Sequence, residues 1–571
     1  MQNRDGRATP QFVAPSIQAN IWIVLVVLTL GYFMILVDTT IVNVALPTME
    51  KDLHAGFDQI LWVVNAYILA YAVLLITAGR LGNIFGPKRL FIVGLALFTL
   101  ASAACGFSQN AGQLILFRLI QGTAAALLTP QTLAILPSIF PPERRGAAFG
   151  ILSSVAGLAV VVGPTVGGWL VTDFSWQAIF YLNIPIGIGA VVAAVLLLPE
   201  IRSSRRDESR GYRTALDLPG VALASGGLFA LIYALVESQR YAWGPISSFG
   251  AFSLGLTRWS VLSVYSLLVY AVVLLLLFVW WETRAEQPLL PLSLFGDRNF
   301  SVANLIASII GFPFAMFIVL SLFLQSVMGF SAIHAGLTLI PTSIGIMVAG
   351  PIAGRLSDRI NGKYILLAGL VCAALGIGLT AYALALSVNS WQLVFPLAVT
   401  GVGMGFVFAP MTTLAMRDVQ PALAGAASGF LFTNRQVGQA VGSAVIGSVL
   451  ANRVASELPV QAAHFASRLP ASYRGRFVAG FERASHESQN FGVGQAHGAA
   501  LSSDPPHTVA QQLGTLSHEV FGQAFLNAAR PSLAICGAVL LLAALFAGGL
   551  RGGRSADAAR RVDSSALRDA A

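Results

Sequence analysis

The sequence predicts an all-α polytopic membrane protein with fourteen transmembrane helices. Of its 571 residues, 56% are hydrophobic and only 10% are charged, whereas a soluble protein carries about 25% charged residues. A helix needs about 20 apolar residues to cross the hydrocarbon core of a bilayer. Apolar runs of this kind lie at 20–46, 59–79, 90–108, 111–137, 146–171, 179–199, 217–237, 260–281, 300–326, 335–354, 363–386, 392–415, 425–450 and 531–550.

The basic residues indicate the orientation of the chain. An even number of spans places both termini on one side, and the segments on that side hold most of the 34 Lys and Arg residues. Since cytoplasmic loops carry an excess of these residues, both termini and the Arg-rich loop 201–213 are expected in the cytoplasm. The net charge of +9 then reflects basic loops, and no nucleic-acid partner is expected.

The sequence contains no pattern that indicates a cofactor or a metal site. Cys105, Cys372 and Cys536 lie inside predicted spans, and no CxxC pair is present. The phosphate-binding pattern GxxxxGK[ST] is absent as well, so ATP is not the expected energy source. We therefore predict no cofactor, no metal and no catalytic residue.

Two short segments recur at nearly the same offset, which indicates that the chain contains two related halves. Residues 79–88 resemble residues 354–363, and residues 146–150 resemble residues 425–429. Transporters built from parallel six-helix repeats bind their substrate near the midplane between the halves. The expected domains are a cytoplasmic tail 1–19, a six-helix bundle 20–200, a linker 201–299 with two inserted helices, a six-helix bundle 300–551 and a cytoplasmic tail 552–571.

The second bundle includes a long polar segment, 451–530, which the topology places outside the cell. Residues 473–484 have a pattern that favours an amphipathic helix. A solvated loop without a specific role is the alternative, since loops of this length are either functional or disordered.

Motifs in five spans carry a resemblance to a known family. They are residues 36–47 in span one, 62–67 in span two, 118–122 in span four, 163–168 in span five and 434–438 in span thirteen. Together they resemble the fourteen-span drug:proton antiporters of the major facilitator superfamily, the EmrB/QacA type, over nearly the whole chain. The resemblance implies the major facilitator fold, with two six-helix bundles plus two inserted helices, in the inner membrane of a bacterium.

The resemblance also implies a function, which is proton-coupled export of drug-like or amphipathic small molecules, without enzymatic activity. Members of the family also export single endogenous metabolites or siderophores, so a dedicated exporter stays open, as does a non-coupled facilitator. A membrane enzyme or respiratory proton pump would need Lys, His or Glu along several spans, and these spans hold almost none. The expected partners are a small-molecule substrate, protons and lipid; nothing indicates a periplasmic adaptor protein.

Asp38 and Arg118 are the candidate residues for proton coupling. An ionised carboxylate inside a span costs at least about 2.5–3.5 kcal/mol, so such a residue is retained when it faces water or a partner. The two spans run in opposite directions, and a rise of about 1.5 Å per residue places both side chains at a similar depth, where they are able to pair. The alternatives are that Asp38 only ties helices together and that Arg118 binds backbone carbonyls.

Other polar and aromatic residues are candidates for the substrate cavity. The set is Asn43, Trp62, Asn65, Tyr67, Gln121, Asn434, Arg435 and Gln436. For the trio around Arg435, a structural network between helices is the alternative. Further aromatic candidates in span nine, for which core or lipid packing is the alternative, are Phe312, Phe314, Phe317 and Phe323.

The resemblance assigns gating and antiporter motifs as well. Their residues in this chain are Gly79, Arg80, Asn83, Gly86, Gly163, Pro164, Gly354, Arg355, Asp358 and Arg359. In the family the first loop usually has Asp where this chain has Asn83 and a basic residue where it has Ile84, and the acid is thought to pair across the cytoplasmic gate. Asn83 is able to hydrogen-bond a helix N-terminus but brings no charge, so this gate is expected to be weaker or differently controlled.

Overall fold

The structure is a computed structural model. It describes residues 20–200, 216–238, 240–241, 243–247, 252–254, 257–487 and 507–550. The predicted tails and the basic loop 201–213 lie outside the described residues.

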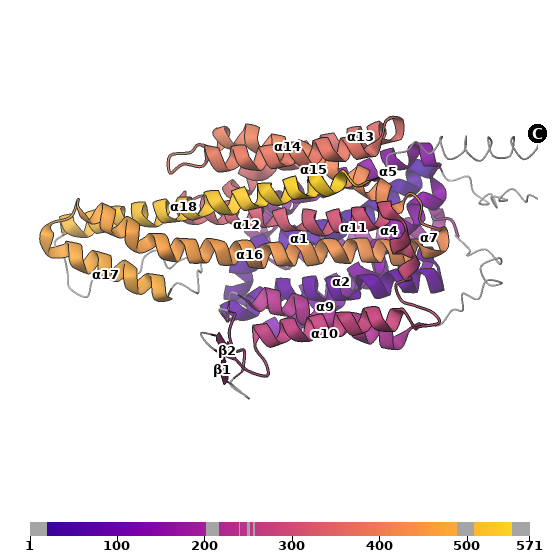
Figure 1. The fold of residues 1–571 in the computed structure, drawn as a ribbon, viewed down its shortest axis with the longest axis horizontal. Helices are drawn as coiled ribbons and strands as arrows, with labels where there is room; N and C mark the ends of the chain where they lie inside the picture. Colours follow the sequence, from indigo (N-terminus) through magenta and orange to yellow (C-terminus); the bar gives the residue numbers. More distant parts are fainter. Residues whose placement is uncertain are drawn as a thin grey trace, which may run out of the picture.

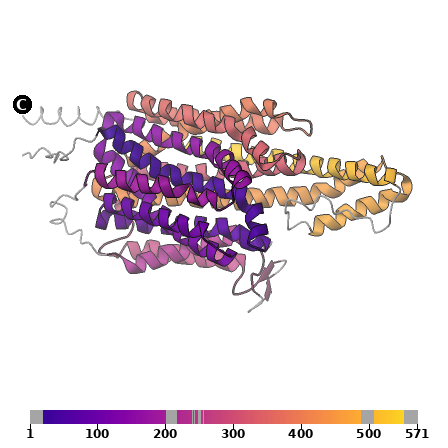
Figure 2. The same ribbon diagram turned by 180° about the vertical axis from the view of Figure 1, so that it is seen from behind.

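Long helices run side by side along one axis of the molecule (Figure 1; Figure 2 shows the opposite face). Those of the first half are α1 (Ile21–Asp52), α2 (Phe57–Phe85), α3 (Pro87–Gly106), α4 (Ala111–Ile139), α5 (Arg145–Asp173, preceded by the 3₁₀ turn Pro142–Arg144), α6 (Ala178–Tyr181) and α7 (Asn183–Leu197). The long helices of the second half are α13 (Ala332–Arg359), α14 (Gly362–Ala383), α15 (Ser390–Met416), α16 (Ala424–Ala466) and α18 (His507–Ala547).

Thirteen helices in the described part of the chain are long and apolar enough to cross a membrane. The remaining predicted span corresponds to α16, which lies lengthwise among the others (Figure 1). Its sequence is more polar because it carries Asn434, Arg435 and Gln436. The predicted fold class, an all-α membrane protein with fourteen spans, is confirmed.

The span predicted at 300–326 is one membrane crossing but not one regular helix. It consists of α11 (Arg298–Gly311), a 3₁₀ turn (Phe312–Phe314), α12 (Ala315–Leu322) and a π-helical turn (Phe323–Val327). Pro313 lies in the 3₁₀ turn, and because proline has no backbone N–H and its ring clashes with the preceding turn, the regular helix breaks there.

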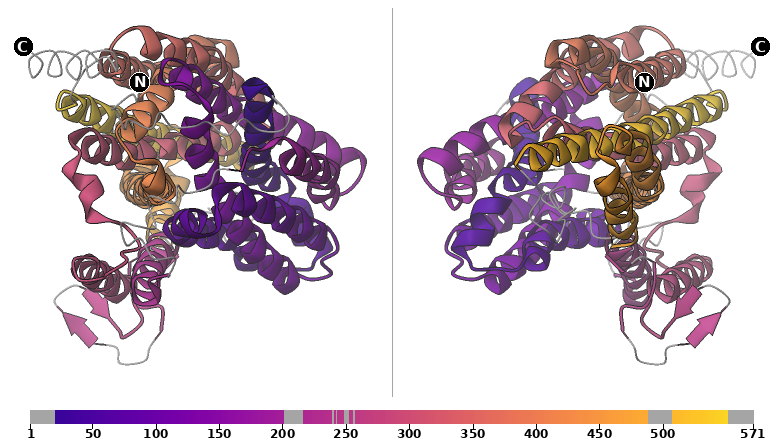
Figure 3. Two further views of the ribbon diagram at one scale, coloured as in Figure 1. Left: turned by 90° about the vertical axis from the view of Figure 1, so that its right-hand side faces the viewer. Right: turned by 90° about the vertical axis from the view of Figure 1, so that its left-hand side faces the viewer.

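The two inserted helices form a hairpin on one side of the bundle (Figure 3). They are α9 (Leu218–Glu237) and α10 (Val264–Glu282), and their connection contains the antiparallel strands β1 (Phe252–Leu254) and β2 (Thr257–Trp259), with Phe252 opposite Trp259. Helix α9 packs against both α2 and α16, with Leu228 in the same apolar cluster as Ile76 and Ala427. The hairpin therefore covers a place where the two halves meet.

In the described parts of 451–530, helices of the bundle continue. Helices α16 and α18 both extend beyond the ends of their neighbours, and α17 (Ala471–Glu487) lies beside them (Figure 1). Helix α17 covers the stretch 473–484 for which an amphipathic helix is predicted. Its Phe477 and Phe481 are buried in a cluster with Leu458 and Leu516 that also includes residues of the bundle, so the apolar core of the bundle continues into the extension.

Two helix pairs join the halves. Helix α5 packs against α13, and α2 packs against α16. The recurring segments 79–88 and 354–363 lie at one end of these pairs, which we call the repeat end. We call the opposite end, where α17 lies, the α17 end. Because α2 and α13 finish at the repeat end while α5 and α16 begin there, each pair brings the last turn of one helix to the first turn of the other.

Candidate functional site

Asp38 and Arg118 lie in direct contact in the interior of the first half. Asp38 is on α1, Arg118 is on α4, and both side chains are 0% exposed. The Nη1 of Arg118 donates a hydrogen bond to Oδ2 of Asp38, which forms a buried ion pair. A buried pair of this kind is retained only when further hydrogen bonds satisfy its remaining polar atoms.

Those hydrogen bonds come from α4 itself and from the neighbouring helices α2 and α7. Arg118 Nη1 donates to Gln121 Oε1 at 2.7 Å, and Arg118 Nε donates to the backbone oxygen of Val63 at 3.1 Å. The other carboxylate oxygen, Oδ1 of Asp38, accepts from Gln121 Nε2 at 2.9 Å and from Asn183 Nδ2 at 3.4 Å. Both oxygens of Asp38 are therefore occupied, and the side chain is closed to water in this conformation.

Aromatic rings complete the surroundings of the pair. The guanidinium carbon of Arg118 lies 4.2 Å from the centre of the Tyr67 ring and 5.9 Å from that of Phe180. A cation over an aromatic face is stabilised, and more strongly when it is desolvated. The hydroxyl of Tyr67 is buried without a hydrogen-bond partner, so Tyr67 contributes its ring rather than its hydroxyl to this conformation.

Sequence reasoning missed Asn183 and Ser102 as members of the site. Asn183 Nδ2 also donates to Ser102 Oγ at 3.0 Å, and Ser102 Oγ donates to the backbone oxygen of Phe180 at 2.9 Å. The available signal was a lone amide in an otherwise apolar span, since polar groups in a span need partners. That signal does not identify the partners of Asn183, because they lie on two other helices, α3 and α1, whose packing the sequence does not give.

Arg435 occupies a second place, between the two halves. It is on α16, and its guanidinium carbon lies 5.3 Å from the ring centre of Phe432 and 5.8 Å from that of Phe408. The phenols of Tyr32 on α1 and Tyr71 on α2 are its electrostatic neighbours. Arg435 thus faces the first half from the second, and it keeps partial exposure.

The other candidates for the cavity have different surroundings. Asn43 is exposed, and its Nδ2 donates to the backbone oxygen of Thr39 at 2.9 Å. Trp62 packs against Tyr233 of α9, with ring centres 5.6 Å apart and the planes tilted by 34°, so it contacts the inserted hairpin. Asn434 ties α16 to α11 through a 3.2 Å bond to the backbone oxygen of Asn304.

The remaining candidates divide between partial exposure and the aromatic core. Asn65 and Gln436 are partly exposed. In span nine, Phe314 contacts Phe317 and Phe408, and Phe312 and Phe317 are partly buried. Phe323 is fully buried beside Phe525, with ring centres 6.2 Å apart.

At the repeat end, α2 and α16 are in close contact through glycines. A Cβ atom on Gly79 would lie 2.2 Å from the backbone oxygen of Gly425, so neither position has room for a side chain. The Oδ1 of Asn83 accepts a hydrogen bond from the backbone N–H of Gly425 at 3.1 Å. Asn83 therefore satisfies a free N–H at the start of a helix that belongs to the other half.

Helices α5 and α13 make the matching contact. A Cβ atom on Gly354 would lie 2.1 Å from the backbone oxygen of Gly146. The two carboxylate oxygens of Asp358 accept from the backbone N–H groups of Gly146 and Ala147 at 2.8 and 2.9 Å. The repeat end is closed in this structure by two related contacts, one neutral and one with a carboxylate at a helix N-terminus.

Comparison with known proteins identifies the family of this chain. Residues 28–443 match the model of the Major Facilitator Superfamily. This chain belongs to the Major Facilitator Superfamily. A tetracenomycin C resistance and export protein of Streptomyces glaucescens is 31% identical over 94% of this chain and 92% of its own, and the multidrug resistance protein Stp of Mycobacterium tuberculosis is 34% identical over 74% of each chain.

Solved structures agree with the assignment at the level of the fold. The human organic anion transporter MFSD10 aligns with a TM-score of 0.54 at 13% identity, over 88% of this chain and 100% of its own. The matches to the family model and to the relatives confirm the family predicted from the sequence motifs. This family consists of membrane transporters of small molecules rather than enzymes. The bacterial relatives are resistance and export proteins.

The remaining motif residues have different surroundings in the structure. Arg80 is buried, Arg355 and Arg359 are exposed, and Gly86 ends α2 with a φ of +90°, which favours glycine. On α5, a Cβ atom on Gly163 would lie 2.0 Å from Oγ1 of Thr40, and Pro164 contacts Gly336 of α13. Helix α5 is therefore held close to both α1 and α13.

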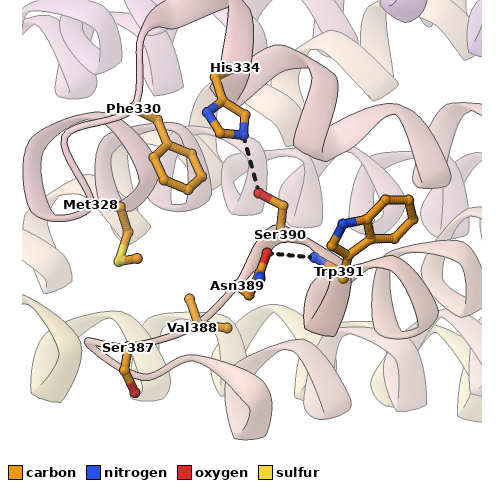
Figure 4. Close-up of a pocket in the computed structure, with 8 residues that line it drawn as sticks. All are labelled: Met328, Phe330, His334, Ser387, Val388, Asn389, Ser390 and Trp391. Atoms are coloured by element: carbon orange, nitrogen blue, oxygen red, sulfur yellow. Dashed lines mark hydrogen bonds between the residues drawn. The ribbon is translucent and has the colours of Figure 1, made fainter.

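A surface pocket of about 460 Å³ lies at the α17 end, where α13 and α15 begin (Figure 4). His334 stacks on Phe330 with ring centres 4.1 Å apart, and its Nε2 lies 3.4 Å from Oγ of Ser390. Neither Asp38 nor Arg435 lines this pocket. It is thus separate from the two embedded charge sites.

Proposed function

We propose that this protein is a proton-coupled antiporter that exports drug-like or amphipathic small molecules, antibiotics among them, from a bacterial cell. The observation that carries the proposal is the Asp38–Arg118 pair, a titratable carboxylate enclosed in the bundle together with its counter-charge. Intramembrane carboxylates mark ion and proton pathways in transporters. The named functions of the relatives support the choice of antibiotics as substrates.

In this proposal the repeat end faces the cytoplasm, and both termini lie on that side. The bundles 20–200 and 300–551 are the two moving halves, the linker 201–299 joins them, and the contacts at Asn83 and Asp358 are the cytoplasmic gate. With the gate closed, Asp38 exchanges its proton only after α1 moves, because both of its oxygens are bonded.

Protonation of Asp38 removes its negative charge and weakens its bond to Arg118. The cation then depends more on Gln121, the backbone oxygen of Val63 and the ring of Tyr67, so α1 and α4 are less firmly held together. Entry of a proton from outside thereby favours the rearrangement that returns the empty carrier to the cytoplasmic side. A substrate that leaves as the proton enters is exchanged against it.

Transport into everted membrane vesicles tests the proposal. Vesicles with an acidic interior are given ethidium and several antibiotics, with and without collapse of the pH gradient. We expect accumulation of at least one compound that disappears when the gradient is collapsed. Accumulation that does not depend on the gradient would identify a facilitator, and accumulation of a single compound out of a broad set would identify a dedicated exporter.

A further inference from the structure

Three charged side chains lie deep inside the spans of the described part, and they do not balance. Asp38 and Arg118 neutralise each other. Arg435 is the third, and no ion pair of the described residues includes it. The interior between the halves therefore carries one excess positive charge.

Close packing fixes the position of α16 beside Arg435, and the contacts of the guanidinium show where its side chain lies. On one face of this helix, Gly438 and Gly442 lie so close to α11 that added Cβ atoms would meet the backbone oxygens of Ser308 and Phe312 at 1.8 and 2.4 Å. Asn434 bonds to the same helix. From this closely packed helix, the guanidinium of Arg435 reaches the ring of Phe408 on α15 and has the phenol of Tyr32 on α1 as an electrostatic neighbour.

The surroundings of Arg435 are aromatic and only partly closed. Tyr32, Tyr71, Phe408 and Phe432 are all at least nine-tenths buried, whereas Arg435 keeps partial exposure. A guanidinium binds a carboxylate or sulfonate through two parallel hydrogen bonds, and its planar face stacks on rings. Aromatic neighbours also bind the flat body of an organic molecule.

We propose that Arg435, together with Tyr32, Tyr71 and Phe408, forms the part of the substrate site that binds an acidic group attached to a planar ring. The exported compounds are then preferentially organic anions, and the charge of the substrate is recognised by Arg435 rather than by Asp38. This inference rests on the proposed function, since it assigns the substrate class of the same transporter.

The two charge sites are joined by an aromatic column. Tyr67 lies against Arg118, and it stacks on Tyr71 with ring centres 6.2 Å apart and an angle of 13°. Tyr71 in turn is an electrostatic neighbour of Arg435. An anion that binds at Arg435 and displaces Tyr71 would therefore also shift Tyr67, which contacts Arg118 of the proton-binding pair.

Equilibrium binding to the purified protein in lipid nanodiscs tests the inference without any need for a gradient. The probes are coumarins and anthraquinones, each as the carboxylate, the primary amide and the trimethylammonium analogue. The wild type is expected to bind the carboxylates at least about tenfold more tightly than the amides, as a charge-assisted bond implies. Arg435→Gln removes this preference and leaves amide binding unchanged, whereas Arg453→Gln, an exposed arginine on the same helix, changes neither.

Other results would overturn the inference. They are a wild type that prefers the trimethylammonium probes or does not distinguish carboxylate from amide, and an Arg435→Gln protein of unchanged thermal stability that keeps the wild-type preference for carboxylates or loses amide binding as much as carboxylate binding. If Arg435→Gln does not fold, Arg435→Lys provides the test. This variant should bind the carboxylate probes more weakly than the wild type does and bind the amide probes with unchanged affinity. A carboxylate preference that depends on Arg435 in a protein without gradient-driven transport would contradict only the proposed function.

Discussion

The Oδ1 of Asn83 accepts a hydrogen bond from the backbone N–H of Gly425 at 3.1 Å, across the boundary between the two halves. The Nδ2 of the same side chain is buried without a hydrogen-bond partner. The repeat places Asp358 in the corresponding position of the second half, where both of its oxygens are bonded to backbone N–H groups of α5. One of two equivalent contacts is thus weaker than the other.

Asn83→Asp should strengthen the weaker contact. The substitution replaces the unbonded amide by an oxygen, and a charge-assisted hydrogen bond is worth about 1.5–3 kcal/mol against about 0.5–1.5 for a neutral one. The population with a closed repeat end should rise by about tenfold. Distances between spin labels at Phe85→Cys and Gln420→Cys, both exposed positions on opposite halves, measure this population.

A matched control for this experiment is Asn361→Asp. Asn361 also accepts from a helix N-terminus, but the helix belongs to its own half, so the distances should not change. If Asn83→Asp leaves the distance distribution as it is in the wild type, the contact at Gly425 does not control closure.

Gly354→Ala should prevent the repeat end from closing as it does in the wild type. The new methyl group would lie 2.1 Å from the backbone oxygen of Gly146, and backbone does not yield as a flexible side chain does. Labels at Arg144→Cys and Ile360→Cys should then move apart. Gly378→Ala on α14 has open space around it and should behave as the wild type; equal distances in all three proteins would argue against close glycine packing as the closing contact.

Tyr67 should matter through its ring. Its hydroxyl has no hydrogen-bond partner, so Tyr67→Phe should keep both stability and gradient-driven transport. Tyr67→Ala removes a ring that lies 4.2 Å from Arg118, a contact worth up to about 2 kcal/mol for a desolvated cation, and should reduce transport by about tenfold or more. Transport assays on the two variants at equal expression test this, and a Tyr67→Phe protein as impaired as Tyr67→Ala would assign the role to the hydroxyl instead.

Glu282 should stabilise the junction between the inserted hairpin and the second half. Its buried carboxylate accepts from the backbone N–H groups of Leu289 and Leu290 at 3.2 and 2.9 Å. Glu282→Ala leaves both donors without a partner, at about 1–3 kcal/mol for each buried group, and should lower the melting temperature in nanodiscs. Glu286→Ala, at an exposed position of the same linker, should not; equal melting temperatures would mean that water replaces the carboxylate.

The sequence predicted the spans well because a membrane helix must satisfy its backbone internally and present apolar side chains to lipid. That requirement says less about the described parts of 451–530, where α16 and α18 continue as helices beyond the ends of their neighbours. Polar composition excludes a span there but does not exclude a helix, and the buried Phe477 and Phe481 depend on packing between distant segments.

The embedded site could be predicted only in part. The depth of Asp38 and Arg118 follows from residue counts along two helices, but the rotation of each helix does not. For that reason the contact of Trp62 with Tyr233 of α9 was not foreseen, and Asn183 was not expected to reach Asp38. The excess charge at Arg435 becomes visible only when its neighbours are known.

In the proposed cycle, Asp38 carries the proton that drives export. Asp38→Asn keeps the size of the side chain but cannot lose a proton. Arg118 retains its bonds to Gln121 and the backbone oxygen of Val63, so the protein should still reach the membrane folded, with reduced thermal stability because a buried charge loses its partner. Asp173→Asn, at an exposed position on α5, is the matched control, and Arg118→Lys should impair transport less than Arg118→Ala because it keeps the charge.

The most direct measurement is pH-gradient-driven export in proteoliposomes that contain the purified wild type, Asp38→Asn or Asp173→Asn, with an exported compound found in the vesicle assay. We predict that the gradient drives transport by the wild type and by Asp173→Asn and has no effect on Asp38→Asn. If the gradient drives transport by folded Asp38→Asn at the rate of the wild type, Asp38 is not the coupling residue and the protein does not exchange protons for substrate through this carboxylate.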